Sequence, residues 1–352
     1  MKKHLPALLC CCLLAGCAQT RIVDRINIIQ SIGVDVEGET YKISASYPTY
    51  IKTSQKPSLS PISAESNVIY GGFTALTAKS SQPVEIGQMR TLVISDEFAG
   101  KAISELAGII NRETIKSSNA TLVLTKQSAS SIIAATLKKP SFFLSELIEQ
   151  NMVHGNTPIT NYHSFVDQYY GEGQDVYLPV IGTDRGSLRL DGVGVFKGDE
   201  LKLWLTNEEG LYLKLLADKA LTGEYDFKVG PKGMYSFRIL HGKRKITIAH
   251  NGNVTIALRL FLEFRELPNG MDVRNRRDLH EAQRQIEAEF AAAIKAMLVR
   301  FQKNGVDPAG FGERCRQQDR RYGEQAFYEK TYPNLNFDVK PKITILHAGV
   351  GH

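Results

Sequence analysis

The stretch DLHEAQRQIEAEFAAAIKAMLVRFQK, residues 278–303, decides how the C-terminal part of the chain folds. Its apolar side chains recur every three or four residues, which is the spacing of one helix face: Leu279, Ala282, Ile286, Phe290, Ile294, Met297, Leu298 and Phe301. Asp278 and Glu281 match a capping box at its start, and Asn304 with Gly305 predicts its end. We therefore expect a long amphipathic helix over about 278–303, whose apolar face needs another element to cover it.

Strands are predicted before and after this helix. Their segments alternate between apolar and polar residues, or are wholly apolar, and cover 235–240, 245–249, 254–264 and 337–346. Turns are predicted at His241-Gly242 and at 251–253. Residues 223–352 are thus expected to form a C-terminal domain, in which the long helix packs on an antiparallel sheet.

The preceding residues predict two further domains. Residues 17–139 alternate between short apolar strands and amphipathic helices, as in an N-terminal α+β domain. Residues 52–66, rich in serine, proline and lysine, are interpreted as a loop within it. Residues 140–222 predict a middle domain of helices followed by strands, which can be discontinuous and share strands with the first. The predicted fold class is α+β, with three domains of mixed sheets flanked by helices.

The composition is that of an ordinary globular protein. Of 352 residues, 43 are basic and 37 acidic, which gives a formal net charge of +6, and 43% are hydrophobic. These values exclude a collagen-like, low-complexity or wholly disordered chain. Acidic residues are interspersed among the basic ones, unlike the concentrated basic face of a DNA-binding domain, so no nucleic-acid partner is predicted.

The first seventeen residues have the pattern of a bacterial lipoprotein signal. A cationic start is followed by an uncharged stretch at 5–15, which is shorter than the roughly 20 residues that span a bilayer. The stretch ends in a lipobox, formed by Leu14, Ala15, Gly16 and Cys17. We expect residues 1–16 to be a signal peptide, cleaved between Gly16 and Cys17, and the Cys17 thiol to carry a diacylglyceryl group. Two acyl chains hold a protein firmly on a membrane, whereas one binds reversibly.

The other cysteines agree with this interpretation. Cys10, Cys11 and Cys12 lie in the predicted signal peptide, and Cys17 takes the lipid. Only Cys315 remains, so no disulfide within the mature chain is expected.

A search for catalytic and metal-binding patterns leaves only weak candidates. No pair of histidines has HxxxH, HxH or HExxH spacing. His154 and His163 could meet in space with Asp167, but surface histidines are the simpler interpretation. The glycines at 171, 173, 192 and 194 lack the third glycine of a phosphate-binding loop and are better explained by turns and bulges.

No P-loop or GxSxG nucleophile motif occurs, and adjacent acidic pairs are explained as helix starts: Asp96 with Glu97, and Glu208 with Glu209. Trp204 falls at strand spacing and is interpreted as core. The prediction is that the protein is not an enzyme and has no catalytic residue, cofactor or metal site.

Two basic clusters have two interpretations. One is Lys243-Arg244-Lys245, and the other comprises Arg274, Arg276 and Arg277. They either touch anionic lipid, at about 1 kcal/mol per charge near the surface, or form a solvated turn and a helix start.

Several short motifs, in their order and spacing, resemble those of the Ger(x)C family of spore germination lipoproteins. After the lipobox come IVDRIN at 22–27 and SIGVD at 31–35. DGVGVFKGDEL at 191–201 is similar to the family's G-x-A-x-F hairpin and is followed by Glu208-Glu209. Toward the end, VDPAGFG at 306–312 resembles its D-x-x-G-x-G segment, and YEKTYP at 328–333 resembles its close.

The resemblance covers nearly the whole chain and implies a function. Members are C subunits of nutrient germinant receptors of the GerA, GerB and GerK type, held by lipid on the outer face of the spore inner membrane. It implies a three-domain α+β fold, complex formation with two integral-membrane subunits of the A and B type, and no catalytic activity.

Two other classes of protein fit parts of the sequence. A solute-binding lipoprotein of a transporter has the same kind of signal and size, but usually two similar α/β lobes. An envelope hydrolase is disfavoured because the motifs that such chemistry needs are missing.

Overall fold

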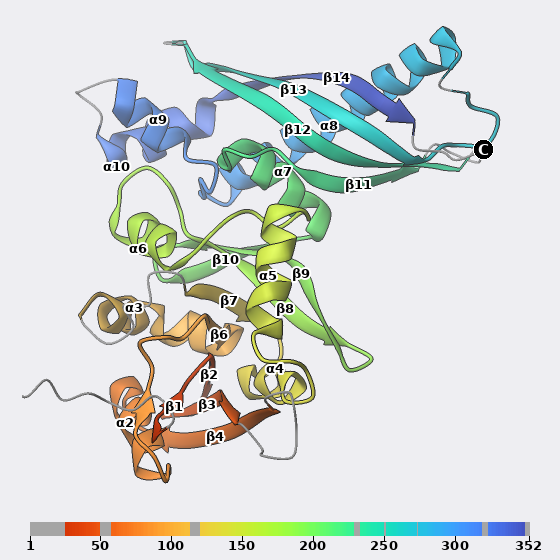
Figure 1. Ribbon diagram of the computed structural model, residues 1–352. Coiled ribbons are helices and arrows are strands. Elements are labelled where there is room, and N and C mark those ends of the chain that lie inside the picture. The colour runs from red at the N-terminus through yellow and green to blue at the C-terminus, as the bar shows by residue number, and fades with distance from the viewer. Residues whose placement is uncertain are drawn as a thin grey trace, which may run out of the picture.

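The computed structural model describes residues 25–49, 58–112, 120–228, 233–249, 251–272, 274–318 and 323–348. Within them the chain forms sheets of eight, four and two strands, and helices pack on both larger sheets. The molecule is elongated, with the N-terminal strands at one end and the four-stranded sheet at the other (Figure 1). This arrangement confirms the predicted α+β fold class.

The eight-stranded sheet has parallel strands at its centre and antiparallel hairpins at its edges. Its order is β10-β9-β8-β7-β6-β2-β3-β4. The strands are β2 (Ser31–Glu37), β3 (Thr40–Thr49), β4 (Ser58–Ser66), β6 (Thr91–Ser95), β7 (Thr121–Thr125), β8 (Tyr177–Asp184), β9 (Ser187–Lys197) and β10 (Glu200–Leu205). β2, β6, β7 and β8 pair in parallel. Central strands such as TLVIS and TLVLT carry three consecutive apolar residues because both of their faces are covered.

Helices cover the two faces of this sheet. On one face lie α2 (Ile69–Ala78), α3 (Asp96–Arg112) and α6 (Tyr162–Tyr170), which share an apolar core with Leu122 and Leu124 of β7. On the other face lie α4 (Ala129–Thr136) and α5 (Phe143–Val153), in a core that includes Val123. Successive residues of a strand point to opposite faces, so β7 contributes to both cores. A short parallel pair, β1 (Asn27–Ile28) with β5 (Val84–Glu85), lies beside them.

The eight-stranded sheet continues across residue 140, where a domain border is predicted. β8, β9 and β10 extend the sheet that β2, β6 and β7 begin. The prediction allowed the first two domains to share strands, and the exact borders of the three domains stay predictions.

The four-stranded sheet forms the other end of the molecule. Its order is β11 (Gly223–Lys228), β12 (Met234–Ile248), β13 (Asn253–Glu266) and β14 (Asn336–Ala348). The long helix α8 (Arg276–Lys303) packs on one face, where Ile286, Phe290 and Ile294 are fully buried. α7 (Asn207–Ala217) completes this core, and its N-terminus carries a capping box between Thr206 and Glu209.

The final strand joins this sheet in parallel. β11, β12 and β13 are antiparallel, as predicted, but β14 runs parallel to β13. The reason is the crossover, because α8 carries the chain back along the sheet before β14 begins. Between them lie α9 (Phe311–Gln318), α10 (Glu324–Ala326), a π-helical turn (Phe327–Thr331) and a 3-10 turn (Tyr332–Asn334).

Three local predictions are wrong. The loop predicted at 52–66 contains β4, an edge strand, where Pro61 is tolerated. The predicted turn at His241-Gly242 is a bulge inside β12, since the register with β13 shifts between Ile239 and His241. The capping box expected at Asp278 does not form.

The start of α8 shows what replaces that box. The helix begins two residues earlier, and Asn275 caps it by accepting a hydrogen bond from the Arg277 backbone N–H. The Asp278 carboxylate instead accepts from the Asp272 backbone N–H at 3.0 Å. The predicted end is confirmed, with Asn304 as C-cap and Gly305 at a φ of 65°.

The SIGVD motif of β2 holds helix α4 against the sheet. A Cβ on Gly33 would lie 2.9 Å from the Ala129 carbonyl oxygen, so the helix can approach only glycine. The buried Asp35 carboxylate accepts from the backbone N–H groups of Ala129 at 2.6 Å and Ser130 at 2.9 Å. These are first-turn donors of α4, which no backbone carbonyl within the helix can satisfy.

We expect Asp35→Ala to lower the free energy of unfolding by about 2–3 kcal/mol, because it leaves two N–H groups of α4, one buried and one partly buried, without an acceptor. Urea denaturation followed by circular dichroism measures this. Asp226→Ala, at an exposed position of β11, is the control and should change stability by less than about 0.5 kcal/mol. An equal loss in both variants would show that the Asp35 contacts do not stabilise the fold.

Candidate functional site: the junction between the two large sheets

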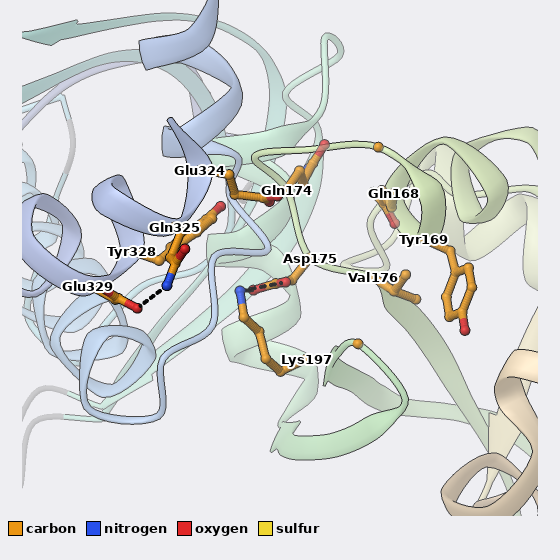
Figure 2. Close-up of a pocket in the computed structure, with 12 residues that line it drawn as sticks. Gln168, Tyr169, Gln174, Asp175, Val176, Lys197, Glu324, Gln325, Tyr328 and Glu329 are labelled. Atoms are coloured by element: carbon orange, nitrogen blue, oxygen red, sulfur yellow. Dashed lines mark hydrogen bonds and ion pairs between the residues drawn. The ribbon is translucent and has the colours of Figure 1, made fainter. Parts of the chain in front are cut away.

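Four side chains meet where the eight-stranded sheet unit joins the C-terminal part of the chain. Asp175 lies in the loop between α6 and β8, and Lys197 ends β9. Asp307 lies between α8 and α9, and Tyr328 lies in the π-helical turn. Figure 2 shows Lys197 extending to Asp175, with Tyr328 on the other wall. We call these four residues the junction cluster.

The two aspartates connect the halves through reciprocal hydrogen bonds. The Asp307 backbone N–H donates to Asp175 Oδ2 at 2.6 Å. The Asp175 backbone N–H donates to the Asp307 carbonyl oxygen at 3.1 Å. Each aspartate therefore fixes the backbone of the other, although 132 positions separate them in the chain.

The Asp307 side chain is fully buried and unusual. Its Oδ2 accepts from the Gly312 backbone N–H at 2.8 Å, at the start of α9, and from the Tyr328 hydroxyl at 3.2 Å. Its Oδ1 is buried and has no hydrogen-bond partner among the described residues. Burial raises the pKa of Asp307 to about 7, more than these donors lower it. The Asp307 carboxyl group therefore takes up or releases a proton near neutral pH.

Lys197 balances the charge of the second aspartate. Its Nζ lies 3.1 Å and 3.2 Å from the two carboxylate oxygens of Asp175, and 4.0 Å from the centre of the Tyr328 ring. Burial raises the pKa of Asp175, and the charge of Lys197 opposes that rise. An ammonium group between a carboxylate and a ring face is stabilised by both.

The backbone around Gly173 also contacts the C-terminal part of the chain directly. The Gly173 carbonyl oxygen accepts from the Glu313 backbone N–H at 2.8 Å, and the Gly173 N–H donates to Glu324 at 3.1 Å. Gly173 has a φ of 94°, and a Cβ there would lie 2.3 Å from the Glu313 nitrogen. The backbones can meet so closely only because residue 173 has no side chain.

A cleft of about 480 Å³ opens beside the cluster (Figure 2). Its walls carry amide and carboxylate groups from both halves, including Gln168, Gln174, Glu324 and Glu329. Among the described residues no group of three or more His, Cys, Asp or Glu side chains could hold a metal ion. Burial raises the pKa of the Cys315 thiol, so this thiol is not activated as a nucleophile. The arrangement joins two parts of the chain.

A second cluster of charged residues lies at the C-terminal end of α7 and comprises Lys214, Asp218 and Arg244. The Lys214 ammonium is buried and donates to the carbonyl oxygens of Met152 and Gly155, both at 2.7 Å. Burial lowers the pKa of Lys214 to about 8, and burial raises the pKa of Asp218 to about 7. Arg244 donates to the carbonyl oxygens of Leu215 and Asp218, and so caps the C-terminus of α7.

Sequence analysis missed most of these residues. Lys214 stands alone in the apolar run LYLKLL, and a lone cation there is a usable signal of a buried amine with fixed acceptors. Asp307 lies in the VDPAGFG motif, but the sequence gives no sign of its pairing with Asp175, which is 132 positions away in the chain. Cys17 and the lipobox residues Leu14, Ala15 and Gly16 lie outside the described residues.

The histidine candidates do not come together as a site. His154 Nδ1 lies 3.4 Å from Arg238, and the His163 ring packs against Tyr162. Trp204 packs at the edge of a core, with the Lys126 ammonium over its ring.

The remaining candidates have structural roles. Gly192, at a φ of 113°, touches the Leu205 carbonyl, and Gly194 faces Leu124. Arg244 is half-buried as a helix cap, which corrects the view of 243–245 as a solvated turn. Arg274 pairs with Asp272 at 3.0 Å.

Two family models match nearly the whole chain. The model described as the spore germination protein N-terminal domain matches residues 19–183. The model described as spore germination B3/GerAC like, C-terminal, matches residues 191–349. The chain belongs to the Ger(x)C family of spore germination proteins. This family is one of germinant receptor subunits and not of enzymes.

Curated relatives and a solved structure agree with this assignment. The chain is 27% identical to the spore germination protein GerQC of Bacillus cereus, over 99% of both chains. It is 21% identical to the putative spore germination protein YfkR of Bacillus subtilis (strain 168), over 97% of this chain and 95% of that one. The crystal structure of the GerBC protein has the same fold, with a TM-score of 0.59 at 14% identity, covering 90% of this chain and 96% of that chain.

The motifs that resemble the Ger(x)C family are the joints of the fold. The D-x-x-G-x-G segment supplies Asp307, together with Gly310 at a φ of 72° and Gly312, and builds the junction. The G-x-G-x-F hairpin supplies the glycines under β10, and SIGVD fixes α4. These residue types are explained by packing and hydrogen bonding without any chemistry.

Gly173→Ala should destabilise the protein more than Gly186→Ala, which is its matched control. Both glycines have positive φ, which costs a substituted residue about 1–2 kcal/mol. Only at 173 does the new Cβ meet backbone, which should cost about 1–3 kcal/mol more, since nothing lies within 4 Å at 186. Chemical denaturation of both variants measures the difference. Equal costs would mean that the junction relaxes without loss.

Asp307→Asn should reduce the pH dependence of stability. Between about pH 4 and pH 7 the folded chain keeps a proton on Asp307 that the unfolded chain releases, so the free energy of unfolding falls as pH rises. The slope from this group is at most about 1.4 kcal/mol per pH unit, and an amide does not titrate. Urea denaturation at several pH values measures it. Asp338→Asn, at an exposed carboxylate, should retain the parent slope; an unchanged slope in Asp307→Asn would contradict the assignment.

Proposed function

We propose that this protein is a lipid-anchored subunit of a nutrient germinant receptor, bound to two integral-membrane subunits of the A and B type. Its place is the outer face of the spore inner membrane, and its role is required for germination triggered by a nutrient. The observation that supports this best is positional. The lipobox ends at Cys17, and the family match begins two residues later, at 19.

The tether in this proposal is short. Eight positions separate Cys17 from Arg25, where the description of the structure begins. At about 3.5 Å per extended residue, they reach at most about 30 Å. No helix among the described residues is both long and apolar enough to cross a bilayer. Attachment through acyl chains on Cys17 would therefore keep the folded body beside the membrane.

Lipid attachment gives such a subunit its physical advantage. Confinement to a plane raises its effective concentration toward membrane partners, so modest contacts suffice for a complex. The body contributes surfaces and not chemistry, in line with the junction cluster, which only joins two parts of the chain. The transporter alternative calls for two similar lobes, whereas this chain has an eight-stranded sheet and a different four-stranded one.

Cys17→Ala should release the protein from the membrane fraction and abolish the response to one nutrient, because no acyl chain can be attached. Immunoblots of spore membrane and soluble fractions, palmitate labelling and germination rates measure these effects. Cys315→Ala is the matched control, since it removes the other mature thiol, and should leave membrane attachment and labelling unchanged. Unlabelled native protein would contradict the anchor, and normal nutrient responses in a deletion strain would contradict the receptor role.

A further inference from the structure

One face of the four-stranded sheet is covered and the other is open. α8 and α7 cover the face that carries Phe237, Ile256 and Leu260. The opposite face carries the alternate residues of the strands, and these are mostly exposed. Five cations gather there over the three longest strands: Lys243 and Lys245 of β12, Arg259 of β13, and Lys340 and Lys342 of β14. We call these five residues the basic face.

Three of these cations stand directly opposite one another. Lys243 pairs in register with Arg259, and Arg259 pairs with Lys342. Neighbouring strands lie about 4.8 Å apart, so three positive charges form a row across the sheet. In the next row of this face, Lys245 and Lys340 flank Ala257. Like charges directly opposite on a sheet are destabilising, so this arrangement does not serve the fold.

The charges of this face are poorly neutralised from within the protein. Among the described residues, no ion pair involves Lys243, Lys245 or Arg259. Lys340 lies 2.7 Å from Asp338, and Lys342 lies 3.9 Å from Glu287. Both lysine side chains remain more than 60% exposed, and exposed pairs of this kind contribute little. The basic face therefore presents its charge to the solvent.

The row on the other side of Arg259 is aromatic. His241 pairs with Phe261, and their rings stack at 4.3 Å with an angle of 14° between the planes. Beyond Phe261 follows Thr344, and Leu346 near the end of β14 is 43% exposed. A row of cations beside an aromatic pair is the combination that suits a lipid headgroup layer, where charge meets phosphate and rings lie at the interface.

We propose that the basic face binds the surface of an anionic phospholipid bilayer. The occupant follows from the shape and charge of the site together. The cations lie on a broad sheet face and point outward in rows, as a plane of phosphates would require. The Arg259 and lysine charges are repeated over three strands and not gathered around one small ligand.

This inference rests on the proposed lipid anchor for its place in the receptor. β1, the first strand after the proposed tether, lies at one end of the molecule, and the sheet that carries the basic face lies at the opposite end (Figure 1). A chain held by both contacts lies with its long axis along the membrane.

The test uses the mature chain with Cys17→Ser, so that no acyl chain contributes and failure of the anchor does not affect the result. Co-sedimentation is measured with vesicles of phosphatidylcholine containing about 30 mol % phosphatidylglycerol, and with phosphatidylcholine alone, at low and high salt. We expect binding to the anionic vesicles only, and weaker binding at high salt.

The triple variant Lys243→Gln, Arg259→Gln, Lys342→Gln should bind about 100-fold more weakly, because each cation near an anionic bilayer contributes roughly a factor of five. Its melting temperature should not fall, since the change removes repulsion. The matched control, Lys138→Gln, Lys295→Gln, Lys303→Gln, removes the same charge from exposed helix and loop positions and should bind like the parent.

Three results would overturn the proposal. The first is no binding of the parent to anionic vesicles at low salt. The second is an equal loss in both triple variants, which would mean that net charge alone matters. The third is undiminished binding by the basic-face variant. Each of these results would show that the row of Lys243, Arg259 and Lys342 is not a site for an anionic bilayer.

Discussion

The structure depends on how two different sheets are held to one another, and a buried carboxyl group carries that contact. Asp307 lies at the junction with no exposure to solvent, and its neighbour Asp175 is nearly as enclosed. Burying such groups is costly unless hydrogen bonds and opposite charge offset the loss of water. Here backbone N–H groups, the Tyr328 hydroxyl and the Lys197 ammonium provide that compensation. The start of α9 and the π-helical turn are positioned by this arrangement.

The strength of the periodic signal determined how much of this could be predicted. α8 repeats its apolar residues over most of its 28 residues, so its face and its end are clear from the sequence. β6 and β7 are short and each has three consecutive apolar residues, which indicates buried strands between helices. β4 is an edge strand whose serine and proline residues are typical of a loop, so its sequence did not predict a strand. The start of α8 was misplaced because Asn275 and Asp278 are equally good caps by residue type, and only the path of the preceding chain decides between them.

The candidate site could not be predicted in the same way. Its partners are far apart in the chain, as with Asp175 and Asp307, and no local pattern records such a pairing. The motifs that resemble the Ger(x)C family did mark the right segments, because they supply the glycines and the aspartate at the joints. The glycines and aspartates of these motifs could be mistaken for binding or catalytic residues. In this chain they join α4, β10 and α9 to their neighbours.

The parallel pairing of β14 with β13 has a consequence for how the chain is made. During synthesis, β11 to β13 and the apolar stripe of α8 emerge well before residues 336–348, which cover the sheet edge. Until then Phe337 and Ile343 are missing from the core. The backbone N–H and C=O groups along the edge of β13 are unpaired, next to the apolar face of α8. Such late closure over a long loop is slow and exposes the intermediate to mispairing. Export through the proposed signal peptide would require the polypeptide to be held unfolded until translocation is complete.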